Sequence, residues 1–193
     1  MRPLRFPFQA PAPARALAIW ASAAAALLAL PSGLHAQSVS SAQARGVVLD
    51  TVTLTNRRDM DFGRVIVPRN GRIDMTAQDT ATCTANNGLT LLDPCQSAAF
   101  DGTAASGFQL RVTVPRRRRI TLSGPGRNLR LRRMTVGAGN GLTFIGRRGR
   151  NFDFLITDPS GDFEFFVGGR LLFRNNQAPG LYSGTFTIQA DYE

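Results

Sequence analysis

The 193-residue sequence contains no lysine, so all 23 of its basic residues are arginine. Its single histidine, His35, and its single tryptophan, Trp20, both lie within the first 36 residues. Cysteine occurs only at Cys83 and Cys95. A chain without those 36 residues has no histidine for acid–base chemistry, no lysine for a Schiff base and, if the cysteines pair, no free thiol. These absences argue against an enzyme, and we assign no catalytic residue and no cofactor.

The first 36 residues have the three parts of a secretory signal peptide. Residues 1–15 carry three arginines and no acid, residues 16–30 are rich in Ala and Leu, and Ala36 offers a small residue for cleavage. A retained membrane anchor is the alternative, but these fifteen apolar residues are fewer than the roughly 20 that a spanning helix needs. We therefore predict export by the general secretory route to the periplasm, cell surface or medium. Residues 37–46 are expected to be a flexible lead-in, and residues 47–193 a single domain.

The charge of the exported chain is strongly positive. Removal of residues 1–36 leaves 20 arginines against 13 acids, a net charge of about +7. Such a surface favours anionic partners, among them acidic polysaccharides, lipid head groups and nucleic acids. Aromatic residues that would stack on bases are not interleaved with the arginines, which argues against a nucleic-acid partner. A coding bias toward arginine is an equally good explanation for the lack of lysine.

The arginines form three groups along the chain. Residues 116–119 are four consecutive arginines, and such a run does not fit a strand with one buried face, so it is expected at an exposed hairpin tip or sheet end. If the groups meet on one face they would bind anions; the alternative is a solvated rim that aids solubility. Arg127 belongs to the second group, and the candidate anion-binding residues are Arg116, Arg117, Arg118, Arg119, Arg130, Arg132, Arg133, Arg147, Arg148 and Arg150.

After residue 36 the sequence shows no helical pattern of useful length, and its apolar residues recur with period two. The run 182–192 alternates in this way, as does 108–114, and each indicates a half-buried strand. The runs 163–167 and 171–173 flank Gly168-Gly169, which predicts a tight hairpin. Short strands separated by Gly and Pro predict an all-β antiparallel sandwich, with a closed barrel as second choice. Further predicted strands are residues 48–54, 62–67, 72–75, 88–92, 120–122, 129–136 and 152–156.

The two cysteines predict one disulfide bond, because an exported chain reaches an oxidising compartment. A Cys83–Cys95 bond would close a short loop and stabilise the fold by a little under about 3 kcal/mol. Metal ligation and thiol catalysis need more partners than these two residues supply.

Acidic residues offer two weaker hypotheses. The run Asp158–Glu164 places oxygens at alternate positions, as some calcium loops do, but its Pro and Gly favour a β-turn, and we assign no metal. The carboxylate pairs Asp59/Asp61 and Asp162/Glu164 would each lie on one face of a strand. They leave a carboxylate-dependent hydrolase as a third, weaker class of function.

Three stretches carry a resemblance to a known family: residues 60–68 (MDFGRVIVP), 165–171 (FFVGGRL) and 180–188 (GLYSGTFTI). Together they resemble a small secreted bacterial family, domain of unknown function 4402, which is similar in pattern to spore-coat-U and pilin-type subunits. The resemblance implies an immunoglobulin-like sandwich that is displayed or assembled outside the cell, and it implies no catalytic residues. Residues 37–46 offer only Val39 as a large apolar side chain, so they are not expected to donate a strand to a neighbouring subunit.

Two functional hypotheses follow. The first is an exported, non-enzymatic structural or adhesive cell-surface protein, fimbria-like, which acts through sheet edges and loops and pairs its strands with copies of itself or with other subunits. The alternative is a monomeric module that binds an anionic glycan or lipid through its arginine-rich surface.

Overall fold

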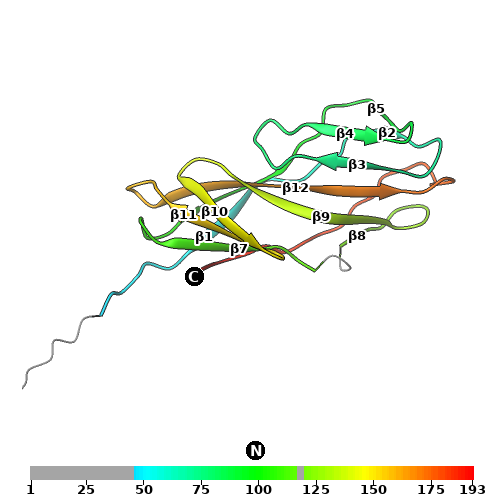
Figure 1. Cartoon of the computed structure of the whole chain (residues 1–193). Coiled ribbons are helices and arrows are strands. Elements are labelled where there is room, and N and C mark those ends of the chain that lie inside the picture. The colour runs from blue at the N-terminus through cyan, green and yellow to red at the C-terminus, as the bar shows by residue number, and fades with distance from the viewer. Residues whose placement is uncertain (1–45, 117–119) are drawn as a thin grey trace, which may run out of the picture. The chain divides into compact units, whose positions relative to one another are not determined.

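The computed structural model describes residues 46–116 and 120–193 (Figure 1). The predicted signal peptide, residues 37–45 of the lead-in and Arg117–Arg119 lie outside the described residues. Every regular element described is a strand, and no helix in this part of the chain is long and apolar enough to cross a membrane. The strands are β1 (Thr53–Arg58), β2 (Val65–Ile66), β3 (Gly71–Met75), β4 (Cys83–Asn86), β5 (Thr90–Leu91), β6 (Ala98–Thr103), β7 (Gln109–Thr113), β8 (Thr121–Leu122), β9 (Leu129–Ala138), β10 (Leu142–Arg148), β11 (Asn151–Ile156), β12 (Asp162–Phe173) and β13 (Gln189–Tyr192).

The larger sheet is organised around the long strand β12. On one edge β12 pairs first with β6 and then with β3, which extend to β1 and β4 respectively. On its other edge β12 pairs with β9, which in turn pairs with β8. All of these pairings are antiparallel.

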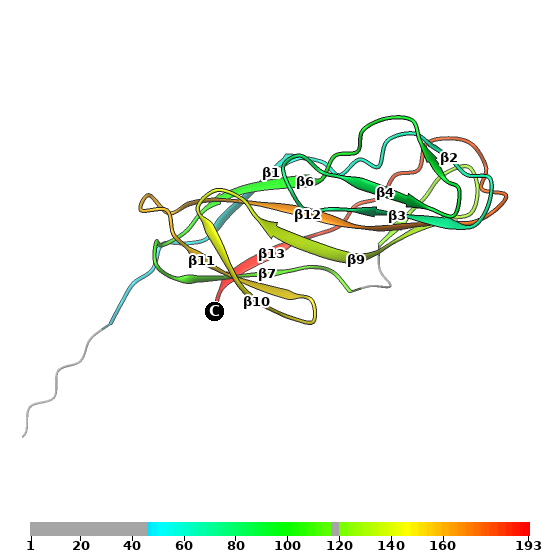
Figure 2. The same ribbon diagram turned by 45° about the horizontal axis from the view of Figure 1, so that its top comes forward.

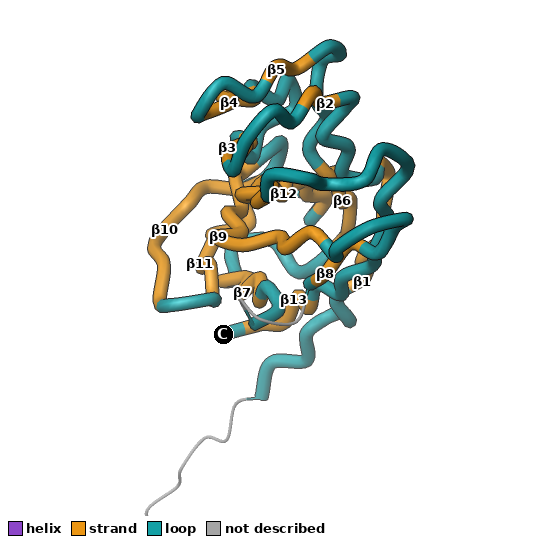
Figure 3. The backbone as a smooth tube through the Cα atoms, turned by 90° about the vertical axis from the view of Figure 1, so that its right-hand side faces the viewer, coloured by secondary structure: helices purple, strands orange, loops and turns teal. Residues whose placement is uncertain are grey.

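The second sheet has the order β10-β11-β7-β13, also antiparallel throughout. Its strands follow one another along one layer in the end-on view of Figure 3. The chain crosses between the two sheets several times, and one of these crossings is the short connection between β9 and β10 (Figure 2). The two layers are separate sheets, and the predicted all-β antiparallel sandwich is confirmed.

The core lies between the layers and is built from alternate residues of both sheets. Leu110 and Val112 of β7 and Phe154 of β11 are fully buried from one side, and Ile73 of β3 and Phe165 of β12 from the other. Phe165 stacks on the Phe100 ring at a centroid distance of 5.2 Å. Alternation with period two is what places these side chains on the inner faces.

The predicted hairpin at Gly168-Gly169 is wrong, because β12 runs without a break from residue 162 to residue 173. The glycines lie where β12 changes its neighbour from β6 to β3. A Cβ on Gly168 would lie 2.6 Å from the carbonyl oxygen of Met75, and a Cβ on Gly137 of β9 would lie 2.0 Å from that of Ala77. The chain that leaves β3 therefore crosses closely over both strands, and glycine is needed for this approach and not for a turn.

Several other strand boundaries differ from the sequence predictions. In the predicted strand at 48–54, pairing begins only at Thr53, where β1 starts, and the run 182–192 is paired as a strand only over β13, with a single bridge at Ser183. The alternation of that run is nevertheless present, because Phe186, Ile188 and Ala190 are buried or half-buried between exposed neighbours. Strands β4, β6 and β10 were not predicted.

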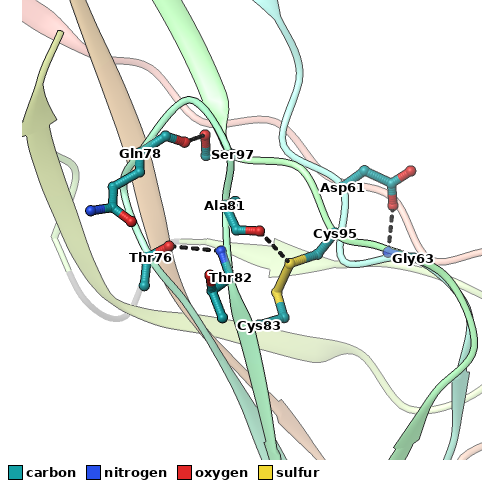
Figure 4. Close-up of a disulfide and its surroundings, with 9 residues drawn as sticks. All are labelled: Asp61, Gly63, Thr76, Gln78, Ala81, Thr82, Cys83, Cys95 and Ser97. Atoms are coloured by element: carbon teal, nitrogen blue, oxygen red, sulfur yellow. Dashed lines mark hydrogen bonds between the residues drawn. A yellow bond between two sulfur atoms is a disulfide. The ribbon is translucent and has the colours of Figure 1, made fainter.

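A disulfide bond joins Cys83, at the start of β4, to Cys95, in the segment that leads to β6 (Figure 4). The Cα atoms of the two cysteines are 6.1 Å apart. Close by, the Ser97 hydroxyl donates to the carbonyl oxygen of Gln78 at 2.6 Å, and the Thr82 amide donates to the Thr76 hydroxyl at 2.8 Å. The bond therefore secures the base of the loop that carries β5 to the edge of the larger sheet.

Candidate anion-binding site

Arginines from all three sequence groups line one pocket at the end of the sandwich where β7 finishes. Its volume is about 340 Å³, and Arg116, Arg132, Arg133, Arg147 and Arg150 line it. Arg116 follows β7, Arg132 and Arg133 belong to β9, and Arg147 and Arg150 belong to the β10–β11 hairpin. All five side chains are on exposed residues. The structure thus brings together residues that are up to 34 positions apart in the sequence.

The pairing of β7 with β11 places the first and third groups side by side. Thr113 lies opposite Asn151, and the amide of Val114 donates to the carbonyl oxygen of Arg150 at 3.0 Å. Gly149 and Arg150 form the two-residue turn between β10 and β11. Gly149 has a φ of 65°, which suits the first position of a type II′ turn, where glycine is preferred. The turn holds Arg150 beside the chain that enters the Arg116 segment.

A bulge in β9 presents two consecutive arginines. Gly168 of β12 is opposite Thr135 and Arg170 is opposite Arg132, so Arg133 and Met134 together face one residue of β12. Arg133 has a φ of 49°, the left-handed conformation that a bulged residue can adopt. Without this bulge, alternation would turn one of two neighbouring side chains inward. Both arginines are instead exposed, while Met134 is buried.

Arg147 is held in place by its neighbours in the hairpin. Its guanidinium carbon lies 4.6 Å from the centre of the Phe152 ring. Phe152 is the residue that pairs with Arg147 across β10 and β11. Its Nε donates to the carbonyl oxygen of Gly149 at 3.0 Å. A cation over an aromatic face contributes about 0.5–1 kcal/mol at exposed sites, so this guanidinium is partly ordered before any ligand arrives.

The charge of the pocket is not neutralised by the protein. Among residues 46–116 and 120–193, where all 13 acids lie, no carboxylate forms an ion pair with any of the five arginines. Elsewhere arginines do pair: Arg111 Nε donates to the buried Asp153 at 2.7 Å, and Arg64 Nε to Asp93 at 2.6 Å. The hydrogen bond that Arg111 donates to Asp153 raises the pKa of Arg111, and the one that Arg64 donates to Asp93 raises the pKa of Arg64. The pocket therefore keeps the positive charge of its five arginines, whereas Arg111 and Arg64 are each paired with a carboxylate.

The other candidate arginines lie outside the pocket wall. Arg117, Arg118 and Arg119 lie outside the described residues. Arg130 is exposed on β9, opposite Thr121 and Leu172, and Arg148 is exposed at the end of β10. Arg127 is also exposed, in the segment before β9.

The candidate carboxylates are used in local structure. An Asp61 oxygen accepts from the amide of Gly63 at 2.8 Å, and Asp59 accepts from the side-chain amide of Asn56 at 2.6 Å. Asp162 accepts from the Ser160 hydroxyl at 2.9 Å, and Glu164 forms an ion pair with Arg57.

The stretch at Asp158 is a β-turn, in which the amide of Gly161 donates to the carbonyl oxygen of Asp158 at 3.0 Å. Hydrogen bonds from the hydroxyl and the amide of Ser160 lower the pKa of Asp158. Within the described residues, no three metal-ligating side chains gather in one place.

Sequence reasoning missed the floor of the pocket. It consists of Val114, Ile120, Leu131 and Met134, each 5% exposed or less. Ile120, Leu131 and Met134 each follow an arginine in the sequence, and only the arginines were predicted to form a binding surface. The signal that was available is the alternation Leu129-Arg130-Leu131-Arg132, which predicts an apolar face directly behind a basic one.

Comparisons with known proteins bear on the family. No curated protein matches the chain. Among solved structures, the chain is similar to the minor tip subunit HdaB of the E. coli Hda pilus, with 20% sequence identity and a TM-score of 0.35, over 75% of this chain and 80% of that chain. The family described as "Domain of unknown function (DUF4402)" matches residues 52–192. Because this match spans most of the sequence, the chain belongs to the DUF4402 family, as the resemblance predicted.

Proposed function

We propose that this protein is an exported, non-enzymatic structural component of the cell surface, fimbria-like, which joins to copies of itself or to other subunits through a sheet edge. The observation that carries the proposal is the edge strand β10. It is seven residues long, it ends the order β10-β11-β7-β13, and it exposes 51% of Phe144 and 50% of Ile145.

Edge strands present unpaired N–H and C=O groups, and natural proteins normally protect them with charges, bulges or short length. The opposite edge, β13, is protected: it has four residues, carries Asp191 and is followed directly by Glu193. Strand β10 also has a bulge, between Phe144 and Gly146, and two charges, but at seven residues it is longer than β13 and its apolar pair remains exposed. A strand added beside β10 would satisfy the free backbone groups and cover these side chains.

The test is an Ile145→Arg substitution. Burying an isoleucine side chain contributes roughly 1.5–3 kcal/mol, so the substitution should weaken self-association by about ten-fold or more. Light scattering of the purified protein over a wide concentration range should show oligomers or fibres for the wild type and a shift toward monomer for the variant.

The matched control is Leu92→Arg, because Leu92 is 54% exposed but lies outside the four-stranded sheet. It should associate as the wild type does. Strictly monomeric wild-type protein, or equal effects of the two substitutions, would count against β10 as the joining edge.

A second function is favoured by the arginine pocket. We propose that the same protein captures an anionic glycan or lipid there. What supports this is the convergence of five exposed arginines around one hollow without an ion-pair partner in the described chain. Its test is the retention of the purified protein on a heparin column, which should decrease as the salt concentration rises.

A further inference from the structure

The arginine pocket has an apolar interior. Val114, Ile120, Leu131 and Met134 form its floor, and all four belong to the continuous hydrophobic core between the sheets. The pocket therefore opens from the basic rim directly toward the core. An apolar ligand group that reached the floor would remove its own surface from water.

The rim and floor together supply donors but no side-chain acceptors. A guanidinium group has five N–H donors and no acceptor. Besides the arginines and the floor, the described lining residues are Pro115 and Gly149, and neither has a polar side chain. A neutral sugar, whose hydroxyls both donate and accept, is poorly matched to this wall. A ligand is well matched to this pocket if its head group only accepts hydrogen bonds and the rest of the molecule is apolar.

We propose that the pocket binds a single-chain amphiphile with a phosphate head group, which rests on the second function proposed above. The guanidinium groups would hold the phosphate oxygens through paired, charge-assisted hydrogen bonds, and the alkyl chain would lie on the floor. The volume of about 340 Å³ is at the lower end of the roughly 300–1,000 Å³ of small-molecule sites. One short tail fits this space, and several do not.

Decyl phosphate, kept below its micelle concentration, is the probe for the purified exported protein. The methyl groups of methionine report where the tail lies, because Met134 is in the floor while Met60 and Met75 are not. In carbon-13 methyl spectra, decyl phosphate should shift the Met134 signal saturably and leave the other two unchanged. Inorganic phosphate lacks the tail and should bind roughly ten-fold more weakly or worse, since a few buried CH₂ groups at about 0.8 kcal/mol each account for that factor. Decyl maltoside keeps the tail but lacks the charge-assisted hydrogen bonds of the phosphate, and it too should bind roughly ten-fold more weakly or worse.

Two triple variants with equal charge separate this site from general basicity. The first replaces Arg116, Arg132 and Arg150 with Gln. The control replaces Arg69, Arg127 and Arg174 with Gln, three exposed arginines outside the pocket lining. The first should lose at least about ten-fold in affinity for decyl phosphate, and the control should stay near the wild type. Thermal unfolding checks that both are folded.

Each contrary result has a distinct meaning. Equal losses in the two triple variants would overturn the pocket as the site. A second outcome is that the pocket variant binds inorganic phosphate more weakly than the wild type, while decyl phosphate binds no more tightly than inorganic phosphate and leaves the Met134 signal unchanged. This outcome would exclude an amphiphile as the ligand but would still support anion binding at the pocket. If decyl maltoside binds as tightly as decyl phosphate, the phosphate head is excluded. If none of the probes binds saturably, both the amphiphile proposal and the proposed anion binding at the pocket are wrong.

Discussion

At the scale of single residues, carboxylates inside arginine clusters set the acid sensitivity of the fold. Asp74 on β3 accepts hydrogen bonds from Arg72 at 3.1 Å and from Arg170 of β12. Partial burial raises the pKa of Asp74, but the hydrogen bonds from Arg170 and Arg72 outweigh it and leave the pKa below its ordinary 3.8. Hydrogen bonds from Arg64 likewise lower the pKa of Asp93.

A lowered pKa means that the folded protein keeps Asp74 charged where the unfolded chain binds a proton. The stabilisation is present above about pH 3.8 and is lost as the pH falls through the folded value. Asp74→Asn should therefore lower the urea midpoint near neutral pH and reduce its further fall in acid. Urea unfolding at about pH 7, 4 and 2.5 measures this. Asp50→Asn, at an exposed residue without an ion pair in the described chain, is the control, and an identical acid response in both variants would refute the role of Asp74.

At the scale of elements, β12 needs glycine at the point where its pairing partner changes from β6 to β3. A Cβ on Gly168 would contact backbone atoms of Met75 and Thr76 at 2.6–2.7 Å, which cannot move without displacing the crossing chain. Gly168→Ala should destabilise the protein by roughly 1–3 kcal/mol, the usual cost of overpacking. Gly146→Ala on β10 is the control, because nothing lies within 4 Å of its Cβ position. Denaturant unfolding gives both values, and equal stability of the two variants would disprove the close crossing.

Alternation predicted which side chains face the core but not which strands pair. The runs 108–114 and 129–136 were predicted to be strands because period two survives there, and the structure buries Leu110, Val112, Leu129 and Leu131 in them. Strand β6 was missed because Ala98 and Gly102 give little hydrophobic contrast, and β10 because Phe144 and Ile145 are adjacent rather than alternate. The meeting of the arginine groups depends on the pairing of β7 with β11. That pairing joins segments about forty residues apart, and no local pattern encodes it.

At the scale of the whole molecule, the two proposed functions respond to salt in opposite directions. Residues 37–193 carry a net charge of about +7, so copies repel one another at long range, while an anionic surface attracts them. The screening length shrinks from about 30 Å at 0.01 M salt to about 10 Å at 0.1 M. Salt should thus favour association through the apolar edge of β10 and weaken anion capture.

Light scattering and retention on a heparin column, both measured from about 20 to 500 mM NaCl, test this opposition directly. Self-association should increase with salt, and heparin retention should decrease. Retention of the variant with Gln at 116, 132 and 150 should be weaker than that of the variant with Gln at 69, 127 and 174, because the two have equal net charge and differ only in where it lies. Association that weakens with salt would show that ion pairs rather than Phe144 and Ile145 hold the subunits together. Equal retention of the two variants would show that heparin binding depends on the total charge of the protein and not on the pocket.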